Sequence, residues 1–244
     1  MVKIISEIHP QHGGDIAVAS EMIRQSALNG ADIVKFQWYD DGQMVFGREY
    51  GDLELSMDDV IHLIKIAEHY DVEPLFTIFD EGSFAGAREL GLKQIKIASR
   101  TVTQFPDLCS RMIDYADEVY VSLGFWEGEE LPFGTSDKLH YFFCIAEYPT
   151  YPTSMKGLPT TYERGGIEGF SDHSLGIDAA LLACARSALY VEKHFSLDKT
   201  NQQERQLAHV CSMGPEELRE LSHFGKRLWR MQDVLISQDA QAGS

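Results

Sequence analysis

The chain has 244 residues, of which 44% are hydrophobic and 24% are charged, a composition typical of a globular protein with a full core. Its formal net charge is −17 and it has no run rich in Lys and Arg, which disfavours nucleic acids and anionic membranes as partners. The N-terminal segment reaches Glu7 too soon for a signal peptide, and no apolar run approaches the roughly 20 residues that span a bilayer. The four cysteines are widely spaced, so we expect reduced thiols and a cytoplasmic location.

Short apolar segments alternate with amphipathic ones along the chain. Segments rich in β-branched or aromatic residues are predicted to be strands at 2–8, 32–37, 73–79, 94–99, 118–124, 140–146, 167–173 and 189–195. Helices are predicted between most of them, at about 15–29, after Ser56, and near 82–90, 104–115, 176–187 and 215–232. Residues at the helix ends support this pattern: Gly30 as a stop, Asp59 three residues after Ser56 as in a capping box, and Pro215 in a first turn.

This alternation predicts a parallel α/β fold, and eight repeats favour a closed (β/α)8 barrel, or TIM barrel, over an open doubly wound sheet. We expect a compact single domain over residues 1–235 and a flexible tail over 236–244. The segment 125–139, between the fifth and sixth strands, contains Pro and Gly and no helical period. A barrel helix is therefore expected to be missing there.

In a barrel of this kind, ligand-binding groups lie at the C-terminal ends of the strands, and every second side chain points inward. Most of the side chains selected by this rule are polar or ionisable. We therefore expect one shared mouth formed by Glu7, Lys35, Gln37, Thr77, Lys96, Ser122, Ala146, Tyr148, Ser171, His173, Glu192 and His194.

Two histidines, His173 and His194, follow adjacent predicted strands at matching depth. Two imidazoles with a carboxylate, supplied by Glu7 or Glu192 directly or through water, are a common set of ligands for a divalent metal. The alternative is two unrelated histidines that are held in place by hydrogen bonds.

Two lysines, Lys35 and Lys96, follow apolar runs, and a buried lysine is costly unless it is paired. Anion binding and Schiff-base catalysis are the functions that this placement indicates. The alternative is a salt bridge with Glu7 or Glu192 inside the barrel.

Three serines and a tyrosine are further candidates for substrate binding. Ser99, Ser122 and Ser171 could surround a phosphate as neutral donors, although a single serine at such a position is also typical of a turn. Tyr148 would place an aromatic ring in the mouth, either against a substrate or packed at the rim.

The segments "SEIHPQHGGD", "GADIVKFQ", "TIFD", "IKIAS", "VSLG", "CIAEYP", "GFSDHSLGIDAAL" and "VEKHF" occur in this order along nearly the whole chain. Jointly they resemble the N-acetylneuraminate (sialic acid) synthase family, which includes legionaminic and pseudaminic acid synthases and spore-coat polysaccharide enzymes. The resemblance implies a transferase that condenses phosphoenolpyruvate with an open-chain amino sugar, an aldose. The expected products are phosphate and a 2-keto-3-deoxy sugar acid for surface polysaccharide biosynthesis.

The resemblance also implies roles for individual residues. His173 and His194 match the family's ligands of Mn²⁺ or Mg²⁺. The phosphoenolpyruvate site is matched by Lys35, Thr77, Lys96, Ser99, Ser122 and Ser171. Glu7 matches the carboxylate near the metal-bound water, with Gln37 and Glu192 beside it. In the implied mechanism the metal polarises the aldehyde, the enol carbon attacks it, water adds at C2, and phosphate leaves.

This sequence departs from the family pattern mainly in the acceptor half of the site. The loop after Gln37 is short, and the chain as given ends before the antifreeze-like domain whose arginine reaches a partner's sugar site. Family residues near the acceptor are replaced by Gln11, Ala146 and Gln206-Leu207-Ala208. We expect a working donor site with an altered or smaller acceptor, or an acceptor site completed by a homodimer or by a separately encoded antifreeze-like domain.

Two other functions stay open at this point. A Schiff-base aldolase could use Lys35 or Lys96. A non-catalytic subunit could bind a partner chain, although such a subunit would need neither the paired histidines nor the paired lysines.

Overall fold

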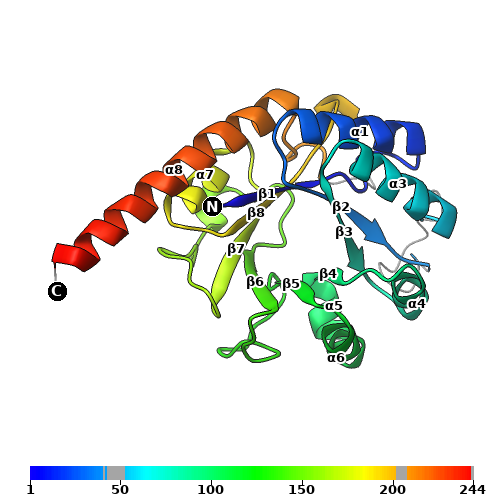
Figure 1. Ribbon diagram of the computed structural model, residues 1–244, viewed down its shortest axis with the longest axis horizontal. Coiled ribbons are helices and arrows are strands. Elements are labelled where there is room, and N and C mark those ends of the chain that lie inside the picture. The colour runs from blue at the N-terminus through cyan, green and yellow to red at the C-terminus, as the bar shows by residue number, and fades with distance from the viewer. Residues whose placement is uncertain (41, 43–52, 202–207, 243–244) are drawn as a thin grey trace.

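The strands close into one barrel of eight, in which each strand is parallel to both neighbours (Figure 1). The computed structural model describes residues 1–40, 42, 53–201 and 208–242. In chain order the strands are β1 (Lys3–Glu7), β2 (Ile33–Trp38), β3 (Glu73–Ile78), β4 (Gln94–Ile97), β5 (Glu118–Ser122), β6 (Leu139–Cys144), β7 (Ile167–Asp172) and β8 (Tyr190–His194). The predicted (β/α)8 fold and each predicted strand are confirmed.

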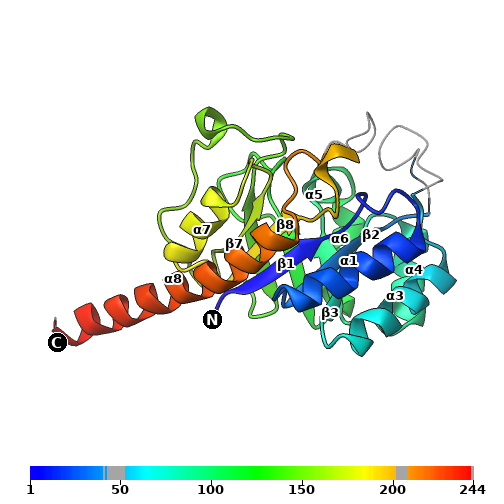
Figure 2. The same cartoon turned by 90° about the horizontal axis from the view of Figure 1, so that it is seen from above.

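Helices pack around the outside of the barrel (Figures 1 and 2). They are α1 (Ile16–Leu28), α3 (Met57–His69), α4 (Glu81–Glu89), α5 (Ser99–Gln104), α6 (Pro106–Tyr115), α7 (Asp178–Ala185) and α8 (Pro215–Ala242). The helix predicted near 104–115 is confirmed as α6, whereas the short helix α5 was not predicted; the two are separated at Phe105, which has φ −134° and ψ 56°. Pro106 disfavours helical dihedrals in the residue before it and is well placed in the first turn of α6.

The expected helix-end signals are present. The carboxylate of Asp15 accepts a hydrogen bond from the backbone N–H of Ala17 at 2.8 Å and so caps α1. Gly30 follows that helix with φ +90°, a dihedral that favours glycine. Ser56 and Asp59 form the reciprocal capping box at the start of α3.

Two consecutive connections lack an α-helix. Residues 123–138 are all described and contain no helix, which confirms the missing barrel helix between β5 and β6. The next connection, 145–166, contains only the 3-10 turn η1 (Pro152–Ser154), in a segment for which no helix was predicted.

Loop segments cover the outer face of β6 in place of these helices. The hydroxyl of Tyr141 donates to the carbonyl oxygen of Gly134 at 2.9 Å. Leu131 and Met155, from the two connections, are partly buried and pack against the hydrophobic core cluster. Apolar burial is thus kept although the layer of helices is interrupted.

The last helix, α8, is longer than the predicted 215–232 and runs from Pro215 to Ala242. The segment 236–244, expected as a flexible tail, is therefore helical as far as Ala242, and its mobility stays a prediction. Figures 1 and 2 show the C-terminal half of α8 extending away from the barrel. Within the described ranges, no helix combines the length and apolarity that crossing a membrane requires.

The barrel interior is layered, and this layering positions the cavity. The layer near the N-terminal ends of the strands is a buried apolar cluster of Ile5, Ile33, Leu75, Tyr120 and Phe142. Because side chains alternate with period two, the next inward positions on the same strands are Glu7, Lys35, Thr77, Ser122 and Cys144. The apolar layer closes the bottom, and polar groups face the open mouth.

A charged cluster joins β5, β6 and β7 near their N-terminal ends. His140 Nδ1 lies 2.7 Å from Glu168 Oε2, and its Nε2 lies 2.5 Å from Glu118 Oε2. Burial opposes a charge on the imidazole, but the two carboxylates outweigh it and raise the pKa of His140. This bridge links the strands whose outer helices are missing.

A pH titration of stability tests this bridge. Because the folded-state pKa of His140 is raised above its ordinary value of 6.5, its stabilisation is fully present below that pH. The stabilisation is lost as pH rises through the raised pKa. We expect the free energy of unfolding of wild type to fall toward that of His140→Gln over this range, as followed by urea denaturation. His62→Gln, on the exposed face of α3, is the control, and a pH-independent gap between wild type and His140→Gln would contradict the bridge.

Candidate functional site

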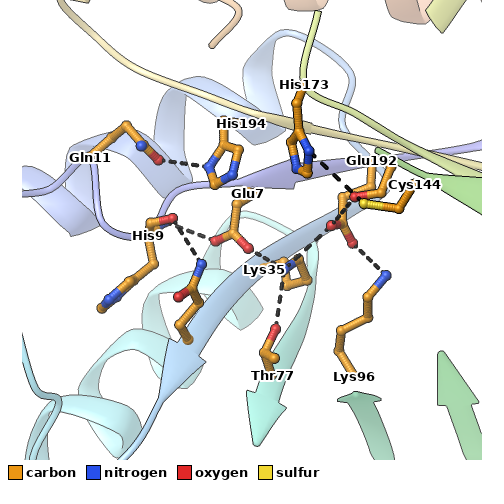
Figure 3. Close-up of polar contacts among 12 residues, drawn as sticks. Glu7, His9, Gln11, Lys35, Thr77, Lys96, Cys144, His173, Glu192 and His194 are labelled. Atoms are coloured by element: carbon orange, nitrogen blue, oxygen red, sulfur yellow. Dashed lines mark hydrogen bonds and ion pairs between the residues drawn. The ribbon is translucent and has the colours of Figure 1, made fainter. Parts of the chain in front are cut away.

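One cavity at the C-terminal mouth of the barrel collects the site residues predicted from the sequence (Figure 3). Its volume is about 150 Å³, which corresponds to roughly five water molecules at liquid density. The predicted residues that line it are Glu7, Lys35, Gln37, Thr77, Lys96, Ser99, Ser122, Ala146, Tyr148, Ser171, His173, Glu192 and His194. The structure therefore brings all of them together, while their roles stay predictions.

A network of buried charges forms the floor of this cavity. Lys35 donates to Glu7 in a short hydrogen-bonded ion pair and to Thr77 Oγ1 at 3.1 Å. Glu192 lies between the two lysines, with Oε1 3.5 Å from Lys35 Nζ and Oε2 2.9 Å from Lys96 Nζ. The salt bridges that the sequence left as an alternative are thus present, and they connect β1, β2, β4 and β8.

Burial and the neighbouring charges shift the pKa values of the groups in this network in different directions. Burial opposes ionisation of Glu192, but the two lysines outweigh it and hold its pKa far below the usual range. Glu7 accepts from Lys35 and from the backbone N–H of His9 at 2.9 Å, yet burial raises its pKa. Burial also lowers the pKa of Lys96, and the nearby charge of Lys35 adds to that effect.

Lys96 has unused hydrogen-bonding capacity in a buried place. Its Nζ forms an ion pair with Glu192 Oε2 at 2.9 Å. The ammonium lies 3.7 Å from the centroid of the Phe142 ring. An ammonium has three N–H donors, and among the described residues only Glu192 lies within ion-pair distance, so donors remain available to an anionic ligand.

The serines of the site differ in what they already bind. Ser171 Oγ donates to Glu192 Oε1 at 2.9 Å and so supports the carboxylate. Ser99 Oγ accepts from the backbone N–H of Gly124 at 2.8 Å, which leaves its hydroxyl proton for another acceptor. Ser122 follows the inward pattern of β5 and lines the cavity beside them.

The two histidines lie side by side at the mouth, at the ends of the neighbouring strands β7 and β8, with ring centroids 5.6 Å apart. His173 Nδ1 donates to the carbonyl oxygen of Ile145 at 2.7 Å, and His194 Nδ1 lies 3.1 Å from Gln11 Oε1. Each Nε2 is therefore left as the ligating atom, the arrangement that a metal-binding histidine usually has. Burial lowers the pKa of His173 to about 4 and that of His194 well below its usual value, so both rings are neutral near pH 7.

This donor set fits a divalent metal in part. Within the described residues, no group of three His, Cys, Asp or Glu side chains is placed to hold a metal ion. The sequence predicted a carboxylate from Glu7 or Glu192, either directly or through water; both are engaged with the lysines here, so a contact through water is the route that this arrangement leaves and it stays a prediction. The chain offers two neutral imidazoles, and water or substrate oxygens would complete the coordination sphere.

A fully buried ion pair stands behind the histidines and fixes their strands. Lys193 Nζ donates to Asp172 Oδ2 at 2.9 Å and to the carbonyl oxygen of Ser174 at 2.7 Å. Asp172 and Lys193 are partners in the β7–β8 register and precede His173 and His194 in the sequence. Their outward ion pair holds the two imidazoles at the same level of the mouth.

Other residues of the site were not predicted from the sequence. Cys144 and Ala98 line the cavity and follow the period-two alternation, so the same rule could have found them. Arg100 and Phe125 lie past the ends of β4 and β5, where that rule does not apply. Gln11 was expected only as a departure in the acceptor half, and its contact with His194 joins residues far apart in sequence.

Part of the expected acceptor half lies outside the described residues. This applies to Gln206 and Leu207 and to most of the loop that follows Gln37. Of the described positions, Ala146 lines the mouth and Ala208 is buried. The ring of Tyr148 is tilted against that of His173 at a centroid distance of 4.1 Å, which places it at the rim.

The fold and the position of the cavity define a (β/α)8-barrel protein with its ligand site at the C-terminal ends of the strands. The chain belongs to the NeuB family, whose sequence profile matches residues 22–234. This confirms the resemblance that the motifs suggested.

Individual relatives agree with this membership. The chain is 30% identical to the N,N'-diacetyllegionaminic acid synthase of Legionella pneumophila, over 89% of this chain and 69% of that protein. It is 28% identical to the N-acetylneuraminate-9-phosphate synthase of Drosophila melanogaster, over 91% and 66% respectively. The structure of N-acetylneuraminic acid synthetase from Leptospira borgpetersenii in complex with citrate superposes with a TM-score of 0.82 at 26% identity, covering 94% and 84%.

Neutralising one member of the ion pair behind the histidines tests its structural role. Asp172→Asn leaves a charged lysine buried without a carboxylate, so we expect a loss of about 3–5 kcal/mol in the free energy of unfolding, measured by denaturant titration. The double variant Asp172→Leu with Lys193→Met should recover part of that loss, because neither charge remains. Glu21→Gln, which breaks an exposed pair with Arg24, is the control and should change little. A loss below about 1 kcal/mol in Asp172→Asn would contradict the role.

Proposed function

We propose that this chain condenses phosphoenolpyruvate with an aldehyde sugar, in a metal-dependent reaction that forms a C–C bond and releases phosphate. The product would be a sialic-acid-like 2-keto-3-deoxy sugar acid. The observation that carries the proposal is the buried Lys96, whose donors face a cavity that also contains the paired neutral histidines. Membership of the NeuB family and relatives named as legionaminic acid and N-acetylneuraminate-9-phosphate synthases support it.

The donor half would bind phosphoenolpyruvate through its phosphate and carboxylate groups. Lys96 supplies a buried ammonium with unused donors, and Ser99 supplies a hydroxyl proton. Lys35 supplies a second cation, which Glu7 and Glu192 hold protonated despite its burial. These groups are oriented before substrate arrives, so little reorganisation is needed when negative charge moves onto the leaving phosphate.

His173 and His194 would hold the Mn²⁺ or Mg²⁺ ion through Nε2. A divalent ion bound there acts as a Lewis acid toward the acceptor aldehyde. Gln11 and the carbonyl oxygen of Ile145 fix the imidazole tautomers from behind.

The bond changes can be assigned to the two substrates and one water. The enol carbon C3 of phosphoenolpyruvate attacks the aldehyde carbon, and the aldehyde oxygen takes up a proton from solvent, which is replaced by the proton that the added water loses; the second proton of that water leaves with the phosphate. Water adds to C2 and gives its proton to Glu7, whose raised pKa suits a general base. The tetrahedral intermediate at C2 then collapses to a ketone and breaks the C–O bond to phosphate, which Lys96 and the serines retain.

The acceptor half would take an amino sugar or another aldose at the mouth. The cavity volume of about 150 Å³ suits the three-carbon donor, and the cavity opens at the mouth, so most of the sugar would lie toward the rim, near Tyr148 and Ala146. An alanine cannot hydrogen-bond a sugar substituent, which supports an acceptor with fewer polar groups at that point. Surface polysaccharide synthesis is the pathway that the family relatives support.

Schiff-base chemistry is the weaker alternative on this geometry. A Schiff base needs a neutral amine, but Lys35 is held protonated by two carboxylates. Lys96 has a lowered pKa but still lies within ion-pair distance of Glu192. A non-catalytic partner-binding role would leave the buried cations and the paired histidines without a purpose.

Phosphate release tests the proposal as a whole. The chain is incubated with phosphoenolpyruvate, Mn²⁺ and a mixed pool of aldoses that spans trioses, N-acetylhexosamines and acetylated diamino sugars. We expect release that depends on both metal and sugar and is lost in His173→Ala. Release that is independent of sugar, or that persists in His173→Ala, would contradict the condensation.

A binding experiment tests the donor site separately. Lys96→Gln removes the buried ammonium, and we expect the Kd of phosphoenolpyruvate in calorimetry to rise by about tenfold to hundredfold. Lys93→Gln is the matched control, because Lys93 is exposed and precedes the same strand. Equal effects of the two variants, or no effect of Lys96→Gln, would show that Lys96 does not bind the donor.

A further inference from the structure

Two buried histidines of the first loop, His9 and His12, have no part in the reaction as proposed. Both follow β1, and both side chains are buried. His12 Nε2 lies 2.9 Å from His9 Nδ1, and His9 Nε2 lies 3.4 Å from the hydroxyl of Tyr39, the residue that follows β2. The ring of His9 meets those of His12 and Tyr39 edge-on, at centroid distances of 4.8 and 5.7 Å. The three side chains therefore form a continuous chain from the first loop to the end of β2.

A backbone N–H fixes the direction of each hydrogen bond in this chain. The N–H of Gly14 donates to His12 Nδ1 at 3.1 Å, so the proton of His12 lies on Nε2. His12 Nε2 then donates to His9 Nδ1, which places the proton of His9 on Nε2, where Tyr39 accepts it. A proton added to either ring would set two N–H groups against each other. Both rings are therefore neutral, and burial accordingly lowers the pKa of His12 to about 4 and that of His9 well below its usual value.

The loop that this chain holds contacts the site at two points (Figure 3). The backbone N–H of His9 donates to Glu7 Oε1 at 2.9 Å, and the carbonyl oxygen of His9 accepts from Gln37 Nε2 at 3.4 Å. Two residues later, Gln11 Oε1 accepts from Nδ1 of His194 at 3.1 Å. Because only one residue separates His9 from Gln11, a displacement of the His9 ring would disturb both contacts.

Packing alone does not require two imidazoles at this place. Apolar side chains would fill the same space without burying polar atoms, whereas each buried imidazole has two nitrogens that need partners. Directed hydrogen bonds add a single orientation, because a ring that turned away would leave a buried nitrogen unpaired. The chain from His12 to Tyr39 therefore fixes the position of the loop in addition to filling space.

We propose that His12 and His9 are positioning residues for the reaction. They hold the first loop so that Gln11 keeps His194 in one tautomer and the backbone N–H of His9 keeps Glu7 in place. The assignment rests on the proposed function in that His194 serves as a metal ligand and Glu7 as a general base. Neither His9 nor His12 lines the cavity, so their effect on the reaction passes through Glu7 and His194.

Nitrogen-15 NMR of the metal-free protein at pH 7 tests the positioning, because the chemical shift of each ring nitrogen shows whether it carries a proton. In wild type we expect protons on Nε2 of His9 and His12 and on Nδ1 of His194. His12→Gln places an amide N–H near the former Nε2 and so keeps a donor toward His9, and we expect His194 to keep its tautomer. The side chain of His12→Asn is too short to reach His9, and we expect both tautomers of His194 in exchange. His62→Asn, on the exposed face of α3, is the matched control and should leave all three residues unchanged.

The spectra can also overturn the assignment. It is wrong if wild type shows the opposite tautomer at His9 or His12, or if His194 in His12→Asn is the same as in wild type. The signals of His140, near the other end of the barrel, show whether a variant is folded. Should His12→Asn fail to fold, His9→Leu removes the middle ring and keeps the backbone N–H that Glu7 accepts. An unchanged His194 in that variant overturns the assignment equally.

The affinity for Mn²⁺, measured by electron paramagnetic resonance without substrates, connects the positioning to the site. We expect the Kd to rise about tenfold in His12→Asn and to stay within about threefold of wild type in His12→Gln. A Kd in His12→Asn equal to that of the His62→Asn control would contradict the positioning of His194. Wild type that binds no Mn²⁺ would count against the proposed function, and the tautomers, measured without metal, would still decide the positioning.

Discussion

The buried charges that Glu192 links are the constraint on which the site depends. Two ammonium groups and two carboxylates are removed from water, and each is tolerated only because the others compensate it. Glu192 is the member shared by Lys35 and Lys96, and Ser171 supports it from the neighbouring strand. A closed barrel provides this arrangement because it brings the ends of β1, β2, β4 and β8 around one axis above an apolar layer.

The fold and most of the cavity follow from one periodicity. Strands of alternating pattern that end in polar residues indicate a barrel with an open polar mouth, and the inward positions from Glu7 to His194 line a single cavity. The contacts within the cavity could not be predicted from the sequence, because they depend on loop conformations and side-chain rotamers. The approach of Gln11 to His194 and the donation from Ser171 to Glu192 are of this kind.

Outside the site, the helices in the structure differ in places from those that the sequence predicts. The hydrophobic pattern predicted the helix that begins at Pro106 but missed the short helix α5, which directly follows β4 and has only six residues. The connection 145–166 lacks an α-helix because loop residues there already cover the outer face of the sheet. Loop residues that take the place of a helix keep the apolar surface buried although the secondary structure changes. The number of strand–helix repeats therefore does not predict where a helix is missing.

The fate of the donor carbons tests the central claim most directly. The chain is supplied with phosphoenolpyruvate labelled with ¹³C at all carbons, Mn²⁺ and the active aldose, and the products are analysed by mass spectrometry. Condensation predicts one new acid that carries the complete labelled unit attached to the sugar, in amounts equal to the phosphate released. Labelled pyruvate with no labelled sugar acid would mean that the paired charges support hydrolysis instead, and it would contradict C–C bond formation in this cavity.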